Sequence, residues 1–70
     1  ALVINREQNH LIGQATILGN LGRIFLEQNQ ADEAADRLRE SLEIFRSAGA
    51  REQTEYIREL LAEADRTRDS

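Results

Sequence analysis

The 70-residue sequence contains no cysteine, proline, tryptophan, methionine or lysine. The lack of cysteine excludes disulfide bonds and thiolate chemistry. His10 is the single histidine, and no second metal ligand stands near it, so we expect a solvated turn residue and no metal or other cofactor. No apolar run approaches the roughly 18 residues of a membrane span, and Leu2–Ile4 is too short for a signal peptide. We therefore expect a cytoplasmic protein without a membrane partner, and, since no methionine begins the chain, a piece of something longer.

Charge is distributed unevenly along the chain. Residues 1–30 carry two arginines and two glutamates, which cancel, whereas residues 31–70 carry the other 18 of the 22 charged residues and the whole net charge of −4. Phosphate binding needs a basic face, so this acidic balance disfavours a nucleic-acid partner. The weakly charged first part must instead be buried or face a partner.

Apolar residues recur with the i, i+3, i+4, i+7 spacing of amphipathic helices in three segments. This spacing predicts helices over residues 11–28, 31–48 and 51–66. Asn29 and Gly49 follow the first two segments and are suited to the left-handed conformation that ends a helix. No segment alternates with period two, so we predict an all-α fold, an antiparallel helix hairpin followed by a third helix.

A weak internal repeat appears when the chain is shifted by 40 residues. Asn9 then falls on Gly49, and both are common residues at a helix stop. The shift also aligns identical residues, namely Leu2 with Leu42, Ile4 with Ile44, Arg6 with Arg46, Ile17 with Ile57 and Leu21 with Leu61. The alignment of these two helix stops predicts a single repeat segment over residues 1–70. In this segment, residues 1–10 are the remnant of a preceding helix, residues 11–48 are a complete helix pair, and residues 51–66 are the first helix of the next repeat or a cap.

The complete pair resembles a tetratricopeptide repeat. The family pattern W-x2-L-G-x2-Y, then A-x3-F, is similar to Leu18-x2-Leu21-Gly22-x2-Phe25 followed by Ala34-x3-Leu38. The closing proline of the pattern is missing here. The period of about 40 is closer to the extended repeats of the kinesin light chain type. The resemblance implies a fragment of an α-solenoid, in which stacked helix pairs form a curved array.

The resemblance also implies a packing role for small residues. Gly22 and Ala34 would stand where the two helices cross, which explains a glycine inside a helix. Gly19 would lie on the side turned toward the concave groove, either admitting a ligand backbone or being neutral. Ser41 would occupy a small-residue position and bond back to a carbonyl of its own helix.

In this family the first helix of each pair lines the concave groove. The matching side chains here are Thr16, Asn20, Arg23 and Glu27. The Asn20 amide has donors and an acceptor suited to a peptide backbone, and Arg23 is suited to a carboxylate. The resemblance thus implies a protein-interaction module that binds a peptide segment, although these side chains are also compatible with an ordinary solvated helix face.

No pattern indicates an enzyme. The stretch Gly19–Gly22 lacks the preceding strand and glycine spacing of a phosphate-binding loop, and no base stands beside Ser41. An alternative function is a structural segment that mediates stacking or self-association with an empty groove. Ile17, Ile24 and Leu26 widen the apolar face of the first helix beyond what one partner helix can cover, so we expect a homodimer of the isolated chain.

Overall fold

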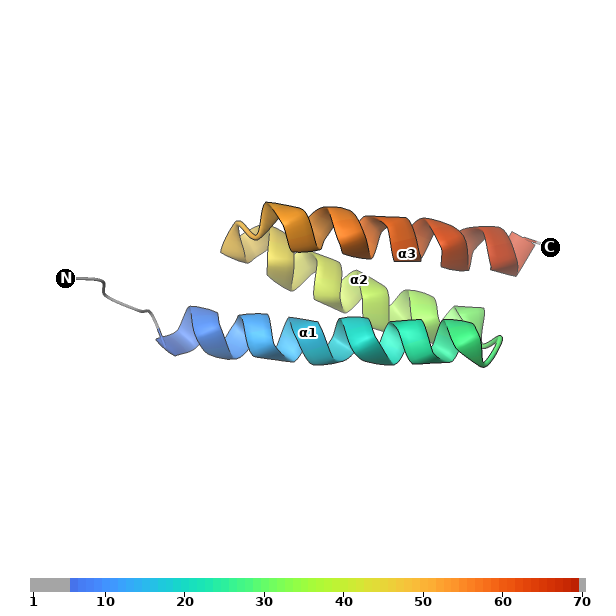
Figure 1. Ribbon diagram of the computed structural model, residues 1–70, viewed down its shortest axis with the longest axis horizontal. Helices are drawn as coiled ribbons and strands as arrows, with labels where there is room; N and C mark the ends of the chain where they lie inside the picture. Colours follow the sequence, from blue (N-terminus) through green and yellow to red (C-terminus); the bar gives the residue numbers. More distant parts are fainter. Residues whose placement is uncertain (1–5, 70) are drawn as a thin grey trace.

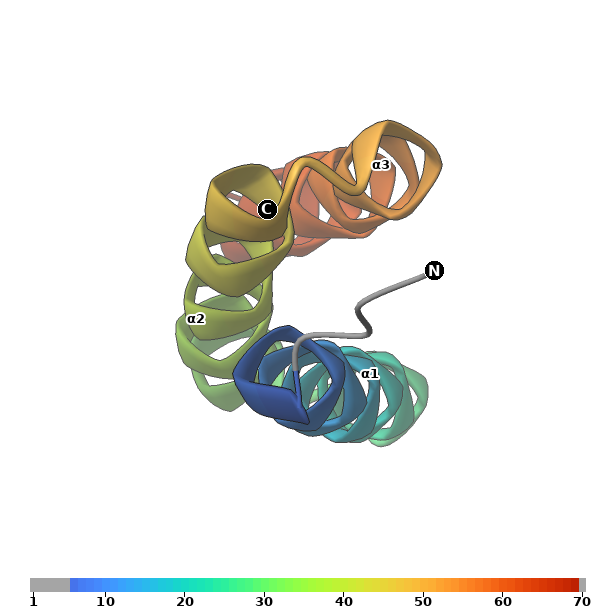
Figure 2. The same ribbon diagram turned by 90° about the vertical axis from the view of Figure 1, so that its left-hand side faces the viewer.

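The computed structural model describes the backbone of residues 6–69 and the side chains of residues 9–68. Over this range it contains three helices, α1 (Arg6–Glu27), α2 (Ala31–Ala48) and α3 (Arg51–Asp69), and no strand. Successive helices run antiparallel (Figure 1). In the end view, α2 stands between α1 and α3 and closes one side of a C-shaped arrangement that is open opposite α2 (Figure 2). The predicted all-α fold of a helix hairpin plus a third helix is confirmed.

The two turns end their helices in the same way. Asn29 and Gly49 both have a positive φ, 64° and 75° respectively. In each turn the following residue donates its backbone N–H to a phenylalanine carbonyl five positions earlier, Gln30 to Phe25 at 2.8 Å and Ala50 to Phe45 at 2.9 Å. These bonds satisfy carbonyls that the helix end leaves free, as in a Schellman motif. Both predicted stop residues therefore act as stops.

The outer ends of the first and last helices differ from the sequence-based expectation. Helix α1 begins at Arg6 and runs through Asn9 without a break, so the expected stop at Asn9 and helix start near residue 11 are wrong. An asparagine inside a helix costs only about 0.7 kcal/mol, which continued backbone hydrogen bonding outweighs. Residues 6–10 thus belong to α1, whereas residues 1–5 of the expected remnant lie outside the described residues. The assignment of repeat boundaries remains a prediction.

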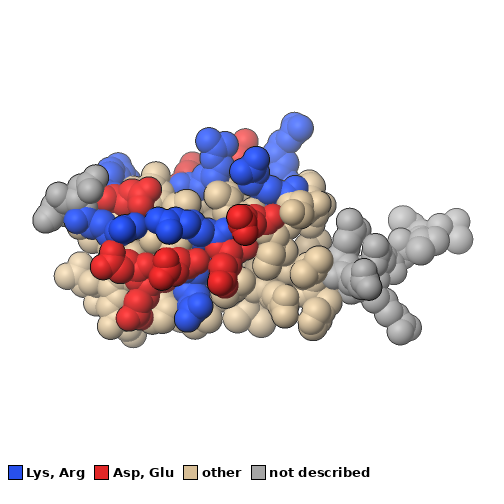
Figure 3. Space-filling model, turned by 180° about the vertical axis from the view of Figure 1, so that it is seen from behind, with Lys and Arg blue, Asp and Glu red and all other residues tan. Residues whose placement is uncertain are grey.

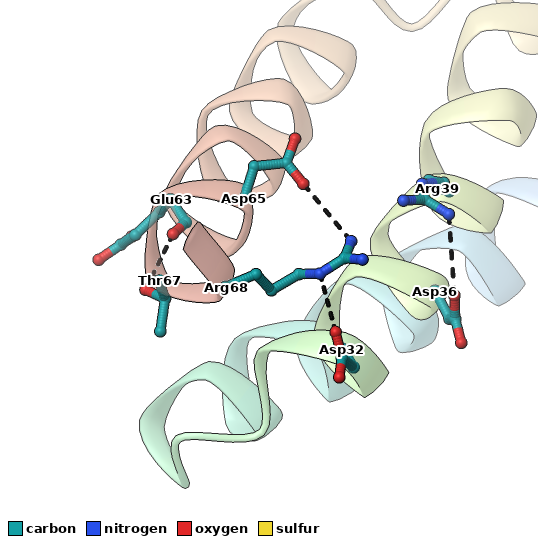
Figure 4. A network of polar contacts seen from close by, with 7 residues as sticks. All are labelled: Asp32, Asp36, Arg39, Glu63, Asp65, Thr67 and Arg68. Atoms are coloured by element: carbon teal, nitrogen blue, oxygen red, sulfur yellow. Dashed lines mark hydrogen bonds and ion pairs between the residues drawn. The ribbon is translucent and has the colours of Figure 1, made fainter. Parts of the chain in front are cut away.

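Helix α3 extends to Asp69, beyond the expected end at residue 66. The Thr67 hydroxyl donates to the Glu63 carbonyl at 3.0 Å, and Arg68 pairs with Asp32 of α2 at 2.8 Å. Figure 4 shows Arg68 reaching from the last turn of α3 toward the start of α2. The last turn of α3 therefore contacts the start of α2 through an exposed ion pair.

Small residues bring α1 and α2 close together. Gly22 is buried, and a Cβ placed on it would lie 2.6 Å from Leu38 Cγ and 3.3 Å from the Ala34 carbonyl oxygen. The predicted contact of Gly22 with the Ala34 region is confirmed. The surrounding core is rich in alanine and comprises Ala15, Ala34, Ala35, Leu38, Phe45, Ile57 and Ala64.

Ser41 links the same two helices by a hydrogen bond. Its side chain is fully buried, and its Oγ donates to the Ala15 carbonyl oxygen of α1 at 2.7 Å. The expected bond to a carbonyl of its own helix is therefore wrong. The close approach of α1 brings an α1 carbonyl within reach of the hydroxyl, so the bond forms between helices.

Alanine at Gly22 should destabilise the hairpin. The added Cβ gains helix propensity, but it meets a buried leucine and a backbone oxygen, and overpacking of this kind costs about 1–3 kcal/mol. We expect Gly22→Ala to lower the free energy of unfolding, measured by urea denaturation followed by circular dichroism. The matched control is Gly13→Ala, where nothing lies within 4 Å of the added carbon, and a gain of about 0.5–1 kcal/mol is expected. Equal effects of the two substitutions would contradict the assigned contact.

Candidate functional site

The four predicted groove residues lie along one side of α1. Their spacing of four, three and four residues places them on the same helix face. All four are exposed: Thr16, Asn20, Arg23 and Glu27. The structure thus places the predicted residues in one row, with α1 presenting them away from its buried core contacts.

The four side chains differ in whether their polar groups already have a hydrogen-bond or ion-pair partner within the described chain. The Thr16 hydroxyl donates to the Ile12 carbonyl at 2.9 Å, so its hydrogen is held within the helix. Within the part of the chain that the structure describes, Asn20, Arg23 and Glu27 make no hydrogen bond or ion pair through their side chains. An amide and a guanidinium are therefore presented side by side without an internal partner.

Gly19 does not belong to this row. It is buried, and a Cβ placed on it would lie 2.8 Å from Ile57 Cδ1 of α3 and 3.5 Å from Ser41 Oγ of α2. The expectation that Gly19 faces the groove is wrong, because α3 packs over this position. The sequence did contain a signal for this contact. Gly19 and Gly22 are three residues apart, so both glycines lie on one helix face, on adjacent turns.

Helix α3 carries a second row that the sequence analysis did not assign. The 40-residue shift places Tyr56, Leu60, Glu63 and Thr67 at the positions of Thr16, Asn20, Arg23 and Glu27. Tyr56 keeps 49% of its surface exposed, and Leu60 is partly buried against the core. Helices α1 and α3 flank the open side of the C-shaped arrangement (Figure 2). The same shift that aligned the repeat would have identified this row.

A polar hollow of about 700 Å³ lies where the α1–α2 turn meets the end of α3, lined by Asn29, Ala31, Asp32, Asp65, Thr67 and Arg68. Its arginine is already paired, with Asp32 at 2.8 Å and Asp65 at 3.7 Å (Figure 4). These side chains are 39–85% exposed, and ion pairs in such settings contribute little to stability. The hollow is therefore better explained as a helix-end contact than as a binding site.

Other kinds of site find no support among residues 9–68, whose side chains the structure describes. No three acidic or histidine side chains in that range come together in a way that would hold a metal ion. His10 is exposed on α1 rather than in a turn. None of the described helices has the length and apolar character needed to cross a membrane.

Comparison with known protein families gives a match over much of the chain. The model of a family described as tetratricopeptide repeat matches residues 1–47 of the 70-residue chain. No curated protein and no solved structure matches significantly. The family match covers the whole α1–α2 turn and all but the last residue of α2, including the Gly22 contact and the row on α1.

Docking of α3 should depend on the missing side chain at Gly19. Gly19→Ala places a methyl group against Ile57 Cδ1, and Ile57→Val removes that carbon. We expect Gly19→Ala to destabilise the wild-type chain but to be neutral or favourable together with Ile57→Val. A double-mutant cycle from urea denaturation should give a coupling of about 1 kcal/mol, in the range for side chains in contact. Additive effects would show that Ile57 does not rest on Gly19.

Proposed function

Because the chain belongs to the tetratricopeptide repeat family, a match that covers residues 1–47, we propose that it binds an extended peptide segment of a protein partner on the open face lined by α1. The family makes the chain a helical-repeat module for protein interaction. The observation that carries the finer proposal is the pair formed by Asn20 and Arg23, which are exposed and have no internal partner among the described residues.

The chemistry of this pair suits a peptide with an acidic group. The Asn20 amide can donate to a peptide carbonyl and accept from a peptide N–H, as a neighbouring strand would. The Arg23 guanidinium can hold a carboxylate by two parallel hydrogen bonds. Glu27 stands one turn further along α1, where it repels a second acidic group and so favours one direction of the peptide.

The row on α3 supplies a different kind of contact. Tyr56 presents an exposed aromatic ring, and Leu60 presents part of an aliphatic side chain. An exposed ring with a polar tip suits an interface, because it buries a large area and still bonds to water or a partner. We therefore expect the bound segment to combine an acidic residue, held by α1, with an apolar residue that contacts α3.

The second candidate function is the structural one, in which the chain associates with itself to form a homodimer and its groove stays empty. The observation that favours it is the exposure of large apolar side chains on α1, of which Ile17 keeps 61% and Ile24 41% of its surface exposed. Leu26, expected to add to this surface, instead packs against the core.

Binding can be tested on an array of extended peptides that differ in acidic content. Loss of a charge-assisted hydrogen bond costs about 1.5–3 kcal/mol, so Arg23→Ala should weaken binding of acidic peptides by roughly tenfold or more. Asn20→Ala should weaken binding of all bound peptides.

The controls replace the same residue types outside the row. Arg37→Ala removes an exposed arginine of α2, and Gln14→Ala removes an exposed amide from another side of α1. Both should bind like the wild type. If the row variants and the controls bound equally well, the groove assignment would be wrong.

A further inference from the structure

The exposed face of α1 opposite α3 forms an uncharged apolar stripe. Ile17, Leu21 and Ile24, here called the outer stripe, follow the i, i+4, i+7 spacing and keep 61%, 38% and 41% of their surfaces exposed. Ile17 precedes Gly19 by two residues, which places the two on opposite sides of the helix, about 200° apart. Since α3 covers Gly19, the outer stripe lies on the side of α1 away from α3. At its edge toward α2, Ile17 borders a hollow that is also lined by Glu40, Glu43 and Ile44 of α2.

The internal repeat shows what this stripe is suited to do. At the 40-residue shift, Ile17 corresponds to Ile57, Leu21 to Leu61 and Ile24 to Ala64 of α3. In α3 these positions form the packing face, since Ile57 and Ala64 are buried and Leu61 is partly buried against the core. The outer stripe thus has the composition of a helix-packing face, but no helix of the described chain covers it.

The distribution of charge favours a second copy of the chain as the occupant. Between residues 9 and 27, α1 carries only Arg23 and Glu27, and both lie in the groove row rather than on the outer stripe. Figure 3 shows acidic and basic side chains gathered over α2 and α3, whereas the lower edge, where α1 lies, is largely uncharged. Two copies can therefore bring their α1 faces together without opposing like charges on α1, while Glu40 and Glu43 of α2, which line a hollow with Ile17, stand at the edge of the stripe.

The apolar surface of the chain is also self-complementary. Among the described residues, the large apolar side chains that stay exposed are Leu11, Ile17, Leu21, Ile24 and Tyr56, of which all but Tyr56 lie on α1. The largest exposed apolar surface of a second copy is therefore its own outer stripe. This is the surface best suited to cover the outer stripe of the first copy. Such a contact is isologous and closes as a dimer with two-fold symmetry.

We propose that two copies of this chain associate through their outer stripes, with the α1 helices antiparallel and Leu21 next to the two-fold axis. The inference rests on the self-association put forward above and adds the surface that mediates it. The antiparallel orientation opposes the two helix dipoles. It also places Ile17 of each copy opposite Ile24 of the other.

Single cysteines test this pairing, because the natural chain contains none. Under mild oxidation, Leu21→Cys should form a disulfide-linked dimer. Ile17→Cys and Ile24→Cys should each cross-link poorly alone but efficiently when the two variants are mixed. Tyr56→Cys, on α3, is the matched exposed control and should stay uncross-linked. Cross-linking of Ile17→Cys or Ile24→Cys alone as efficient as that of their mixture would overturn the antiparallel arrangement.

Sedimentation at several protein concentrations tests the association without cross-linking. The wild type should dimerise, and Ile17→Glu should raise the dimer dissociation constant by about tenfold or more, as loss of a central apolar contact does. Tyr56→Glu should leave the constant unchanged, and the circular dichroism of both variants should stay helical.

The possible outcomes distinguish a failure of the proposed contact surface from a failure of self-association. A wild type that stays monomeric at every concentration would overturn both self-association and this surface. A wild-type dimer that Ile17→Glu leaves intact would overturn the surface alone. Peptide binding by the Asn20 and Arg23 row is read out separately, since Ile17→Glu leaves that row in place.

Discussion

The structure depends on the close approach of three helices at two glycines of α1. Gly22 leaves room for Leu38 and the Ala34 carbonyl of α2, and Gly19 leaves room for Ile57 of α3. A side chain at Gly22 would meet the branch carbon of Leu38 and the Ala34 carbonyl oxygen, whereas one at Gly19 would have to displace the end of the Ile57 side chain. The same proximity lets the buried Ser41 hydroxyl bond to the Ala15 carbonyl across the α1–α2 contact. The two glycines thus lower the helix propensity of α1, but they allow the helices to pack more closely.

This constraint decides which surfaces α1 leaves free. Because α2 and α3 both pack near its glycine face, two other faces of α1 stay open. One carries the polar row with Asn20 and Arg23, and the other carries the outer stripe with Ile17 and Ile24. Both proposed interactions therefore use α1, whereas the charged exteriors of α2 and α3 keep the remaining surface solvated.

Helix ends show where local signals suffice and where they do not. Asn29 and Gly49 stop their helices because a left-handed residue there lets the next N–H groups bond back to free carbonyls. Asn9 has the same local character, yet the helix continues through it. The polar end of α3 is helical to Asp69, and there Arg68 pairs with Asp32 on another helix, a partner that lies 36 residues away in sequence. A stop signal is thus a tendency that surrounding contacts can override.

By itself, the sequence determined the fold class, the two turns, the Gly22 crossing and the row of four residues on α1, because these depend on periodicity and on motifs within one helix pair. Only the tertiary structure decided the partners of Gly19 and Ser41, and that Leu26 is covered whereas Ile17 and Ile24 stay exposed. Each of these depends on where α3 and α2 lie relative to α1. Helical spacing shows which residues share a face, but only the packed helices show which neighbour covers that face and which face stays exposed.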